Sequence, residues 1–273
     1  MIYFYSSGGC GDALIVGLKF SQLIKSNQKL NSLDVTWLNF EKHKKHQLPI
    51  QWIMNGFEIP GVSIIRDEPY KEAIRLAKVY EVYPAKDQYN QLGGYISSII
   101  SNMENPFLEK LIISSKNYNL GPNISIIRNS GRSNDNSTRT ISHEFIIKMR
   151  QKLDNIGVKL PIIILGTKPS EIVEWSPNII DLSGKTETIL DAFEIINNSI
   201  LTIGFDGVLA YYSAMVRQPT IIHFHEPNLV NHYWNERWGE RGHAIIHYNK
   251  KLLDKQDADM DFAIYEDKIL KKS

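Results

Sequence analysis

Four short segments carry side chains that could do chemistry, and each follows an apolar run. The first, residues 6–12, is rich in glycine and includes Gly11 and Asp12. Glycines let the backbone approach a ligand closely, and the amino end of a following helix favours anions. The spacing fits neither GxGxxG nor GxxxxGK[ST], so dinucleotide or P-loop binding is weakly supported. Asp12 is expected either to cap the helix or to act as a general base in a cleft.

The second segment, residues 129–140, is polar and basic. Arginine forks pair bidentately with phosphate oxygens, and hydroxyls and the amino end of the next helix supply further donors. The segment therefore predicts an anion site, with a solvated polar loop as the alternative. The residues concerned are Arg128, Ser130, Arg132 and Arg139.

The third and fourth segments each place a carboxylate near a predicted helix start. Glu171, in the segment that begins at Gly166, could accept from ribose hydroxyls or simply complement a helix dipole. Asp206 and Gly207 follow the apolar run 200–204, and capping is again the alternative role for the aspartate. Upstream of them stands a short polar turn, Gly184-Lys185-Thr186.

Three further signals are less specific. The basic stretch 42–46 is first expected to be a solvated loop, but beside an acceptor cleft it would suit a polyanion. His223, His225 and Glu226 lack a third spaced metal partner, so we expect them to contact donor or acceptor. The carboxylates of Asp257-x-Asp259-x-Asp261 lie in a polar tail, where metal binding is not expected. We therefore predict no metal site. The residues assigned to the acceptor are Lys42, Lys44, Lys45 and His225.

These segments are held by alternating strands and helices. Apolar or alternating runs predict the strands, and helical spacing of apolar residues predicts the helices between them. This alternation favours parallel βαβ units. The predicted strands are 2–6, 33–40, 62–65, 79–83, 124–128, 161–165, 179–182, 200–204, 220–224 and 244–248. The main predicted helices begin near Leu14 and span 91–103, 107–114, 142–156, 188–197, 207–216 and 262–271.

The fold class expected is α/β, with two doubly wound halves that meet near Gly121. In open parallel sheets, ligands sit beyond the carboxyl ends of the strands. Two such sheets that face each other would form a cleft lined by strand-to-helix loops. We expect the Asp12 turn and the arginine-bearing segment to lie across a shared anionic pocket in that cleft.

Composition excludes several classes of protein. The 273 residues are 42% hydrophobic, enough for real cores, and the net charge of +1 disfavours a protein that coats nucleic acid. The single cysteine, Cys10, excludes a disulfide framework. No apolar run approaches the roughly 20 residues of a membrane span, and the first residues lack a signal peptide's charged region. The expected location is the cytoplasm.

Two groups of residues resemble a known family. Gly11-Asp12-Ala13-Leu14-Ile15 is similar to the Gly-Asp-x-Leu-Leu start of the heptosyltransferase-like glycosyltransferases of family nine. The second half follows that family's order, with an apolar strand ending in Gly166, then Leu182-Ser183-Gly184-Lys185-Thr186. Asp206 and the Gln218-Pro219 pair before the next strand follow in turn. The resemblance covers about half of the chain and hardly touches residues 30–120.

The resemblance implies a GT-B architecture of two facing Rossmann-like domains with a cleft between them. Residues 1–120 would form the acceptor-side domain and residues 121–250 the domain that binds a nucleotide-sugar donor. Residues 251–273 would form a helix that packs back on the first domain. No metal and no cofactor are implied.

The resemblance also assigns roles. Asp12 matches the catalytic base, Arg139 the basic residue on the diphosphate, and Glu171 the ribose ligand. Asp206 matches the carboxylate near the donor sugar. The family's serine after that aspartate is Gly207 here, and its histidine is Tyr211, which puts the donor sugar in doubt. The predicted donor-binding residues are Gly11, Ser130, Arg132, Arg139, Gly166, Glu171, Gly184, Lys185, Thr186, Asp206, Gly207 and Tyr211.

The predicted function is a metal-independent, inverting transfer of a sugar from a nucleotide diphosphate to an acceptor hydroxyl. The acceptor is either a glycan or glycolipid, or a hydroxymethylated base in DNA as phage enzymes use. The alternatives are a non-catalytic nucleotide-sugar-binding protein and an epimerase of the same architecture.

Overall fold

The computed structural model describes two compact units. Residues 1–108 with 231–237 form the first unit, and residues 109–230 with 238–273 form the second. The described residues are 2–7, 9–26, 35–40, 44–57, 61–65, 79–81, 108, 118, 120–129, 139–167, 173–227, 244–249 and 253–272. The division falls at residues 108 and 109, earlier than the predicted boundary near Gly121.

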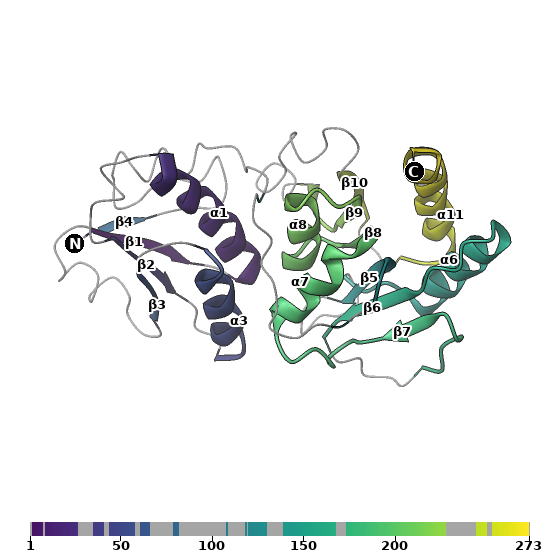
Figure 1. Ribbon diagram of the computed structural model, residues 1–273, viewed down its shortest axis with the longest axis horizontal. Coiled ribbons are helices and arrows are strands. Elements are labelled where there is room, and N and C mark those ends of the chain that lie inside the picture. The colour runs from purple at the N-terminus through teal and green to yellow at the C-terminus, as the bar shows by residue number, and fades with distance from the viewer. Residues whose placement is uncertain are drawn as a thin grey trace. The chain divides into compact units, whose positions relative to one another are not determined.

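The first unit contains a parallel sheet in the order β3-β2-β1-β4 (Figure 1). A helix follows each of the first two strands, as βαβ units require. The elements along the chain are β1 (Ile2–Ser7), α1 (Cys10–Ser26), β2 (Val35–Phe40), α3 (Lys44–Asn55), β3 (Gly61–Ile65) and β4 (Val79–Glu81).

Helix α3 begins inside the basic stretch that the sequence suggests is a solvated loop. Lys44 and Lys45 lie in its first turn, so that expectation is wrong for them. The helix forms because Gln47, Ile50 and Met54 recur on one buried face. It packs with α1 through Phe57, whose ring carbon lies only 2.4 Å from where a Cβ on Gly17 would stand. Glycine at position 17 is therefore what allows this approach.

The second unit contains a six-stranded parallel sheet in the order β10-β9-β8-β5-β6-β7 (Figure 1). Numbered within the unit, this is the order 3-2-1-4-5-6 of dinucleotide-binding folds, so the strand order reverses between β5 and β8. The strands are β5 (Asn123–Asn129), β6 (Ile162–Gly166), β7 (Ile179–Asp181), β8 (Ser199–Phe205), β9 (Thr220–Phe224) and β10 (Ala244–Tyr248). The helices are α6 (His143–Asn155), α7 (Ile189–Asn197), α8 (Val208–Met215) and α11 (Lys255–Ile264). The α/β fold with doubly wound parallel sheets is confirmed.

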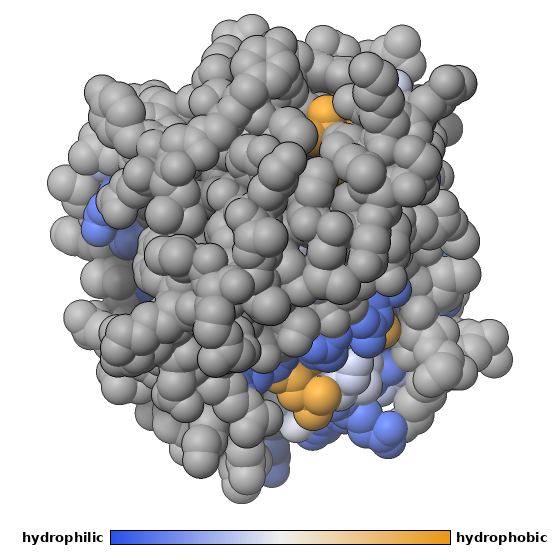
Figure 2. All heavy atoms as spheres, turned by 90° about the vertical axis from the view of Figure 1, so that its left-hand side faces the viewer, coloured by the Kyte–Doolittle hydropathy of each residue, from blue (hydrophilic) through white to orange (hydrophobic). Residues whose placement is uncertain are grey.

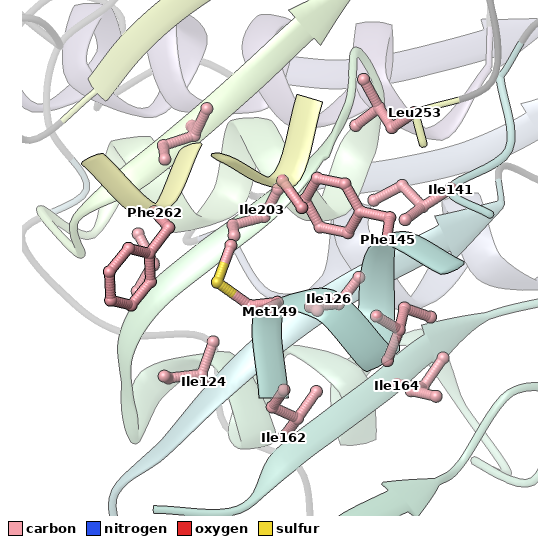
Figure 3. Packing of buried hydrophobic residues seen from close by; sticks show 14 of the residues in the cluster. Ile124, Ile126, Ile141, Phe145, Met149, Ile162, Ile164, Ile203, Leu253 and Phe262 are labelled. Atoms are coloured by element: carbon pink, nitrogen blue, oxygen red, sulfur yellow. The ribbon is translucent and has the colours of Figure 1, made fainter. Parts of the chain in front are cut away.

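Helices cover both faces of this sheet (Figure 1). On one face α7 and α8 pack through the stacked rings of Phe193 and Tyr212, whose centroids are 3.9 Å apart. On the other face α6 and α11 cover one hydrophobic core. Figure 3 shows Met149 of α6 among side chains of that core, including Ile126 and Ile203 of the sheet. Because adjacent strand residues point to opposite faces, each strand contributes to both layers.

The C-terminal helix does not follow its predicted placement. α11 packs on α6 within the second unit, where Phe262 and Tyr265 enter the core. Leu253, just before α11, pairs with Ile141 in an isolated bridge. Phe262 is only 7% exposed, so the apolar face of α11 is buried in the core of the second unit.

Most predicted strands are found, with ends shifted by one or two residues. The predicted helices 91–103 and 107–114 lie outside the described residues, apart from position 108. No helix in the described part of the chain is long and apolar enough to cross a membrane. In the side view of Figure 2, the described residues at the surface are mostly hydrophilic, with small hydrophobic spots.

Candidate functional site

The candidate functional residues of the second unit lie at the carboxyl ends of its central strands. β5 and β8 are neighbours, and β9 lies beside β8. Asp206 follows β8 directly and His225 follows β9. Because parallel strands end at the same edge, side chains that are distant in the sequence meet here. This edge, at the reversal of strand order, is where open α/β sheets bind ligands.

Arg139, Asp206 and His225 form one hydrogen-bonded cluster. Nδ1 of His225 lies 2.9 Å from Oδ1 of Asp206. Nη2 of Arg139 lies 2.5 Å from Nε2 of His225 and 3.5 Å from Oδ2 of Asp206. Asp206 is itself held by its backbone, since its N–H donates to the carbonyl of His223 over 2.9 Å. The cluster thus joins a cation, an imidazole and a carboxylate at one edge.

The contacts assign the tautomer of His225. A guanidinium only donates, so Nε2 of His225 must accept from Arg139. Nδ1 then carries the hydrogen and donates to the carboxylate of Asp206. Glu226 lies 3.5 Å from the same Nε2, but its side chain is 61% exposed, so solvent screens that contact. His225 therefore bridges the guanidinium of Arg139 and the carboxylate of Asp206.

Burial raises the pKa of the Asp206 carboxyl above its usual value, because desolvation penalises the charged form. The Arg139 charge and the hydrogen bond from His225 act in the opposite direction and favour the carboxylate. The residue is only 5% exposed. Arg139 and His225 therefore limit the rise in the pKa of Asp206 that burial causes.

Gly166 allows the end of β6 to lie close to Asn129 at the end of β5. Its φ is +132°, a conformation that side chains rarely adopt, and a Cβ there would lie 2.7 Å from the carbonyl oxygen of Asn129. Thr167 donates to Oδ1 of Asn129 over 3.0 Å, and the carbonyl of Gly166 accepts from Gly184 over 2.9 Å. Sequence reasoning missed Asn129 and Thr167 as site residues, although both stand at strand ends.

The turn Gly184-Lys185-Thr186 lies beside Gly166, to whose carbonyl Gly184 donates. Gly184 has a φ of +65°, which suits glycine. Nζ of Lys185 donates to the carbonyl oxygen of Asp181 over 2.6 Å, and the lysine is exposed. Its ammonium group is thus at the surface near the end of β7, where an anion could compete for it.

Gly207 and Tyr211 lie in the next element. Gly207 is the N-cap of α8 and makes no side-chain cap, and its φ of 168° is ordinary extended backbone. Tyr211 is 4% exposed, and its ring is tilted toward Phe224 at a centroid distance of 6.5 Å. Tyr211, which stands where the family has a histidine, therefore takes part in the packing of α8 on β9.

In the first unit, Asp12 caps its own helix. Its Oδ2 accepts from the N–H of Gly9 over 2.8 Å, and Gly9 accepts from Ala13 to start α1. Asp12 is 8% exposed. Gly11 lies within the same first turn of α1. The capping role predicted as one alternative is present, and the role as a base remains a prediction.

Several predicted site residues cannot be placed. Ser130, Arg132, Glu171 and Lys42 lie outside the described residues. Lys44 and Lys45 are described only as backbone at the start of α3. His225, predicted on the acceptor side, lies with two predicted donor residues, Arg139 and Asp206.

His223 and the acidic run near the C-terminus take structural positions. Nε2 of the fully buried His223 lies 2.8 Å from Oδ2 of Asp261. Asp257 accepts from Asn249, while Asp259 pairs with Lys152 at 2.8 Å. The three carboxylates have separate partners, and no cluster of three or more His, Cys, Asp or Glu residues in the described ranges could hold a metal ion. The contact of His223 with donor or acceptor stays a prediction, and in this structure the side chain is fully buried.

Comparison with known proteins identifies the fold. No family model matches the sequence, and no curated protein matches it. Among solved structures, the glycosyl transferase family 9 protein of Veillonella parvula is similar over 99% of this chain and 97% of its own, with a TM-score of 0.61 and 10% identity. Escherichia coli heptosyltransferase WaaC with ADP has a TM-score of 0.56 at 10% identity, and covers 98% of this chain and 99% of that one.

Escherichia coli ADP-heptose lps heptosyltransferase II is a third such structure. It has a TM-score of 0.52 at 11% identity, and the match covers 100% of this chain and 99% of that chain. The chain therefore has the fold of heptosyltransferase-type GT-B glycosyltransferases. The resemblance noted in the sequence is thus matched by the fold over nearly the whole chain.

Proposed function

We propose that this protein is a glycosyltransferase that binds a nucleotide-diphosphate sugar and transfers the sugar to an acceptor hydroxyl. The observation that carries the proposal is the cluster of Arg139, Asp206 and His225 beside the β5–β8 reversal. Support also comes from the fold, which is that of glycosyltransferases. We place the activity in the cytoplasm as part of the same proposal.

Arg139 is the proposed ligand of the donor diphosphate. A guanidinium binds phosphate oxygens in a bidentate manner, and charge-assisted hydrogen bonds contribute about 1.5–3 kcal/mol each. The contacts of Arg139 with His225 and Asp206 both use Nη2, so its other N–H groups would bind the diphosphate. Lys185 would add a second positive charge, and Gly166, Gly184, Thr186 and Gly207 would let the backbone approach.

Asp206 would then accept hydrogen bonds from hydroxyls of the donor sugar. Its two oxygens are partly engaged by His225 and Arg139, and each oxygen retains further lone pairs. Replacement of the family's histidine by the buried Tyr211 is expected to change which sugar fits.

Asp12 is the proposed base. It would take the proton of the acceptor hydroxyl, whose oxygen attacks the anomeric carbon while the bond from that carbon to the diphosphate oxygen breaks. The electron pair leaves with the nucleoside diphosphate, and Arg139 offsets its growing charge. Attack from the face opposite the leaving group inverts the anomeric configuration. No metal is part of this scheme, because the arginine and lysine supply the positive charge.

The acceptor proposed is a glycan or glycolipid, as the resemblance implies. A hydroxymethylated base in DNA is the competing acceptor, and the lysines at the start of α3 are the feature that would serve it. The slope of acceptor binding against salt separates the two, because contacts with DNA phosphates release counterions and weaken steeply as salt rises.

A non-catalytic nucleotide-sugar-binding protein is the second candidate. It is favoured by Asp12, whose carboxylate already serves as a helix cap, and by the burial of Tyr211. In that case the donor cluster would bind its ligand and no sugar would be transferred or released.

A panel of nucleotide sugars tests both. Binding of ADP-, UDP-, GDP- and CDP-sugars is measured by calorimetry, and release of the free nucleoside diphosphate is followed with and without glycan acceptors. Binding with acceptor-dependent release supports the transferase. Binding without release or transfer supports the second candidate, and no binding to any nucleotide would refute both.

A further inference from the structure

Arg128 is a nearly buried cation without a countercharge in the described part of the chain. The residue is 9% exposed at the carboxyl end of β5, and its Nη1 is buried with no hydrogen-bond partner. A charge removed from water is costly unless it is paired. An uncompensated guanidinium at a sheet edge is therefore a feature that an anion would stabilise.

An aromatic ring and the amino end of a helix lie beside Arg128. Its guanidinium carbon lies 5.8 Å from the ring centroid of Trp175, and His143 meets the same ring edge-on at 4.7 Å. His143 is the first residue of α6, where the helix dipole is positive. Nε2 of His143 is also buried and has no partner among the described residues. Two unsatisfied nitrogen atoms thus flank one indole ring.

The carboxylates of this region are committed elsewhere. Asp181 accepts from the indole N–H of Trp175 over 3.2 Å and from the backbone of Ser183 over 2.9 Å. Glu144 interacts with Ser142 at the amino end of α6 and is almost fully exposed to solvent. Neither forms an ion pair with Arg128 within the described residues.

We propose that Arg128 and His143 form a second oxyanion site that takes a phosphoryl group. A guanidinium that lies over an aromatic ring directs its in-plane N–H groups away from the ring, and two such groups match two phosphate oxygens. Nε2 of His143 donates in one of its neutral tautomers and supplies a further contact.

This site is distinct from the proposed donor cluster. Arg139 turns toward the ends of β8 and β9, whereas Arg128 lies against Trp175, which is hydrogen-bonded to Asp181 of β7. In the sheet order, β5 separates these two sides. The phosphoryl group is either free inorganic phosphate or part of a phosphorylated ligand.

Thermal shift and calorimetry with inorganic phosphate and with ADP test the site. Arg128→Met keeps the stacked hydrocarbon and removes the charge. It is expected to raise the melting temperature without ligand and to weaken phosphate binding by about 10-fold or more. Lys159→Gln is the matched charge control and is expected to keep the phosphate response. Arg139→Gln, in the proposed donor cluster, reports whether the two sites are joined.

Other outcomes are equally decisive. An unchanged affinity of Arg128→Met for both inorganic phosphate and ADP, or binding of neither by the wild type, overturns the proposal. Loss in both Arg128→Met and Arg139→Gln would mean one joint site and would also overturn it. If ADP binding alone depends on Arg128, the phosphoryl group belongs to the nucleotide and the site is not a free-phosphate site. If Arg128→Met does not fold, the phosphate affinity of His143→Asn is compared with that of the wild type instead, and a weaker affinity is expected.

Failure of this site leaves the proposed function intact, because donor binding is tested through Arg139. Conversely, phosphate binding that depends on Arg128 stands even if no nucleotide sugar binds. The two proposals are thus separable by the same set of variants.

Discussion

Asp206 and His225 follow different strands, yet Nδ1 of His225 lies 2.9 Å from Oδ1 of Asp206. The pair exists because β8 and β9 are parallel neighbours that end at the same edge. It holds the imidazole so that its other nitrogen meets Arg139. Arg139, which we propose binds the diphosphate, is therefore oriented by a carboxylate that follows one strand and an imidazole that follows the next.

Replacing Arg139 tests the diphosphate assignment. Arg139→Gln is expected to raise the Kd for a nucleoside diphosphate about 10- to 100-fold, since it removes one or two charge-assisted hydrogen bonds. Lys159→Gln removes the same charge from an exposed position of the same unit and should leave the Kd unchanged. Equal Kd values for the wild type and Arg139→Gln in calorimetry would remove Arg139 from the site.

Asp12 can be tested as a base separately from its role as a cap. In Asp12→Asn the amide oxygen can still accept from Gly9, so the free energy of unfolding should be preserved. Turnover is expected to fall roughly 10²–10⁴-fold with donor affinity unchanged. Asp12→Ala loses the cap as well, at about 1 kcal/mol of stability. Full turnover in Asp12→Asn would show that the carboxylate only caps the helix.

Gly166 should be intolerant of a side chain. In Gly166→Ala the new Cβ would lie 2.5 Å from Oδ1 and 2.7 Å from the carbonyl oxygen of Asn129, at a strained φ. We expect a loss of about 2 kcal/mol or more in the free energy of unfolding. Gly157→Ala is the matched control, because its φ is also positive but nothing lies within 4 Å. Similar losses in urea denaturation of the two variants would contradict a close approach at Gly166.

The second unit is expected to lose stability in acid because of His247. Burial lowers its pKa below the ordinary value, and the neighbouring His223 lowers it further, while Asp261 and Asp257 act in the opposite direction. The unfolded chain therefore binds a proton more readily, so the stabilisation is complete above about pH 6.5 and is lost as pH falls below it.

The measurement is urea denaturation at about pH 7.5 and about pH 5.5. His247→Gln should lose less stability between the two values than the wild type does. Tyr248→Phe, at the adjacent and exposed position, is the control and should behave like the wild type. The same pH dependence in His247→Gln and the wild type would exclude His247 as the group responsible.

Sequence patterns predicted most of the described β-strands, because buried parallel strands read as continuous apolar runs. Apolar periodicity did not predict helix α3. Its first residues are basic, and its buried face is formed by only a few residues, Gln47, Ile50 and Met54 among them. Periodicity also could not assign α11 a partner, since an amphipathic stripe shows that one face is buried but not against what.

For the site, the residue types together with the family resemblance selected Arg139 and Asp206 as candidates, while capping stayed an open alternative for the aspartate. Residue types could not show that His225 belongs with them, nor that His223, two positions earlier, belongs to the core with Asp261. Which of two nearby histidines enters the site depends on where the strand ends and on which helix covers that face.

The amino-acid sequence by itself determined the parallel α/β class, the strand-end loops and the chemical types available in them, since these follow from periodicity and local turn chemistry. Only the tertiary structure decided which loops meet. The order of strands in the sheet is set by long-range packing, and that order brings Arg139 to Asp206 while it leaves Arg128 against Trp175.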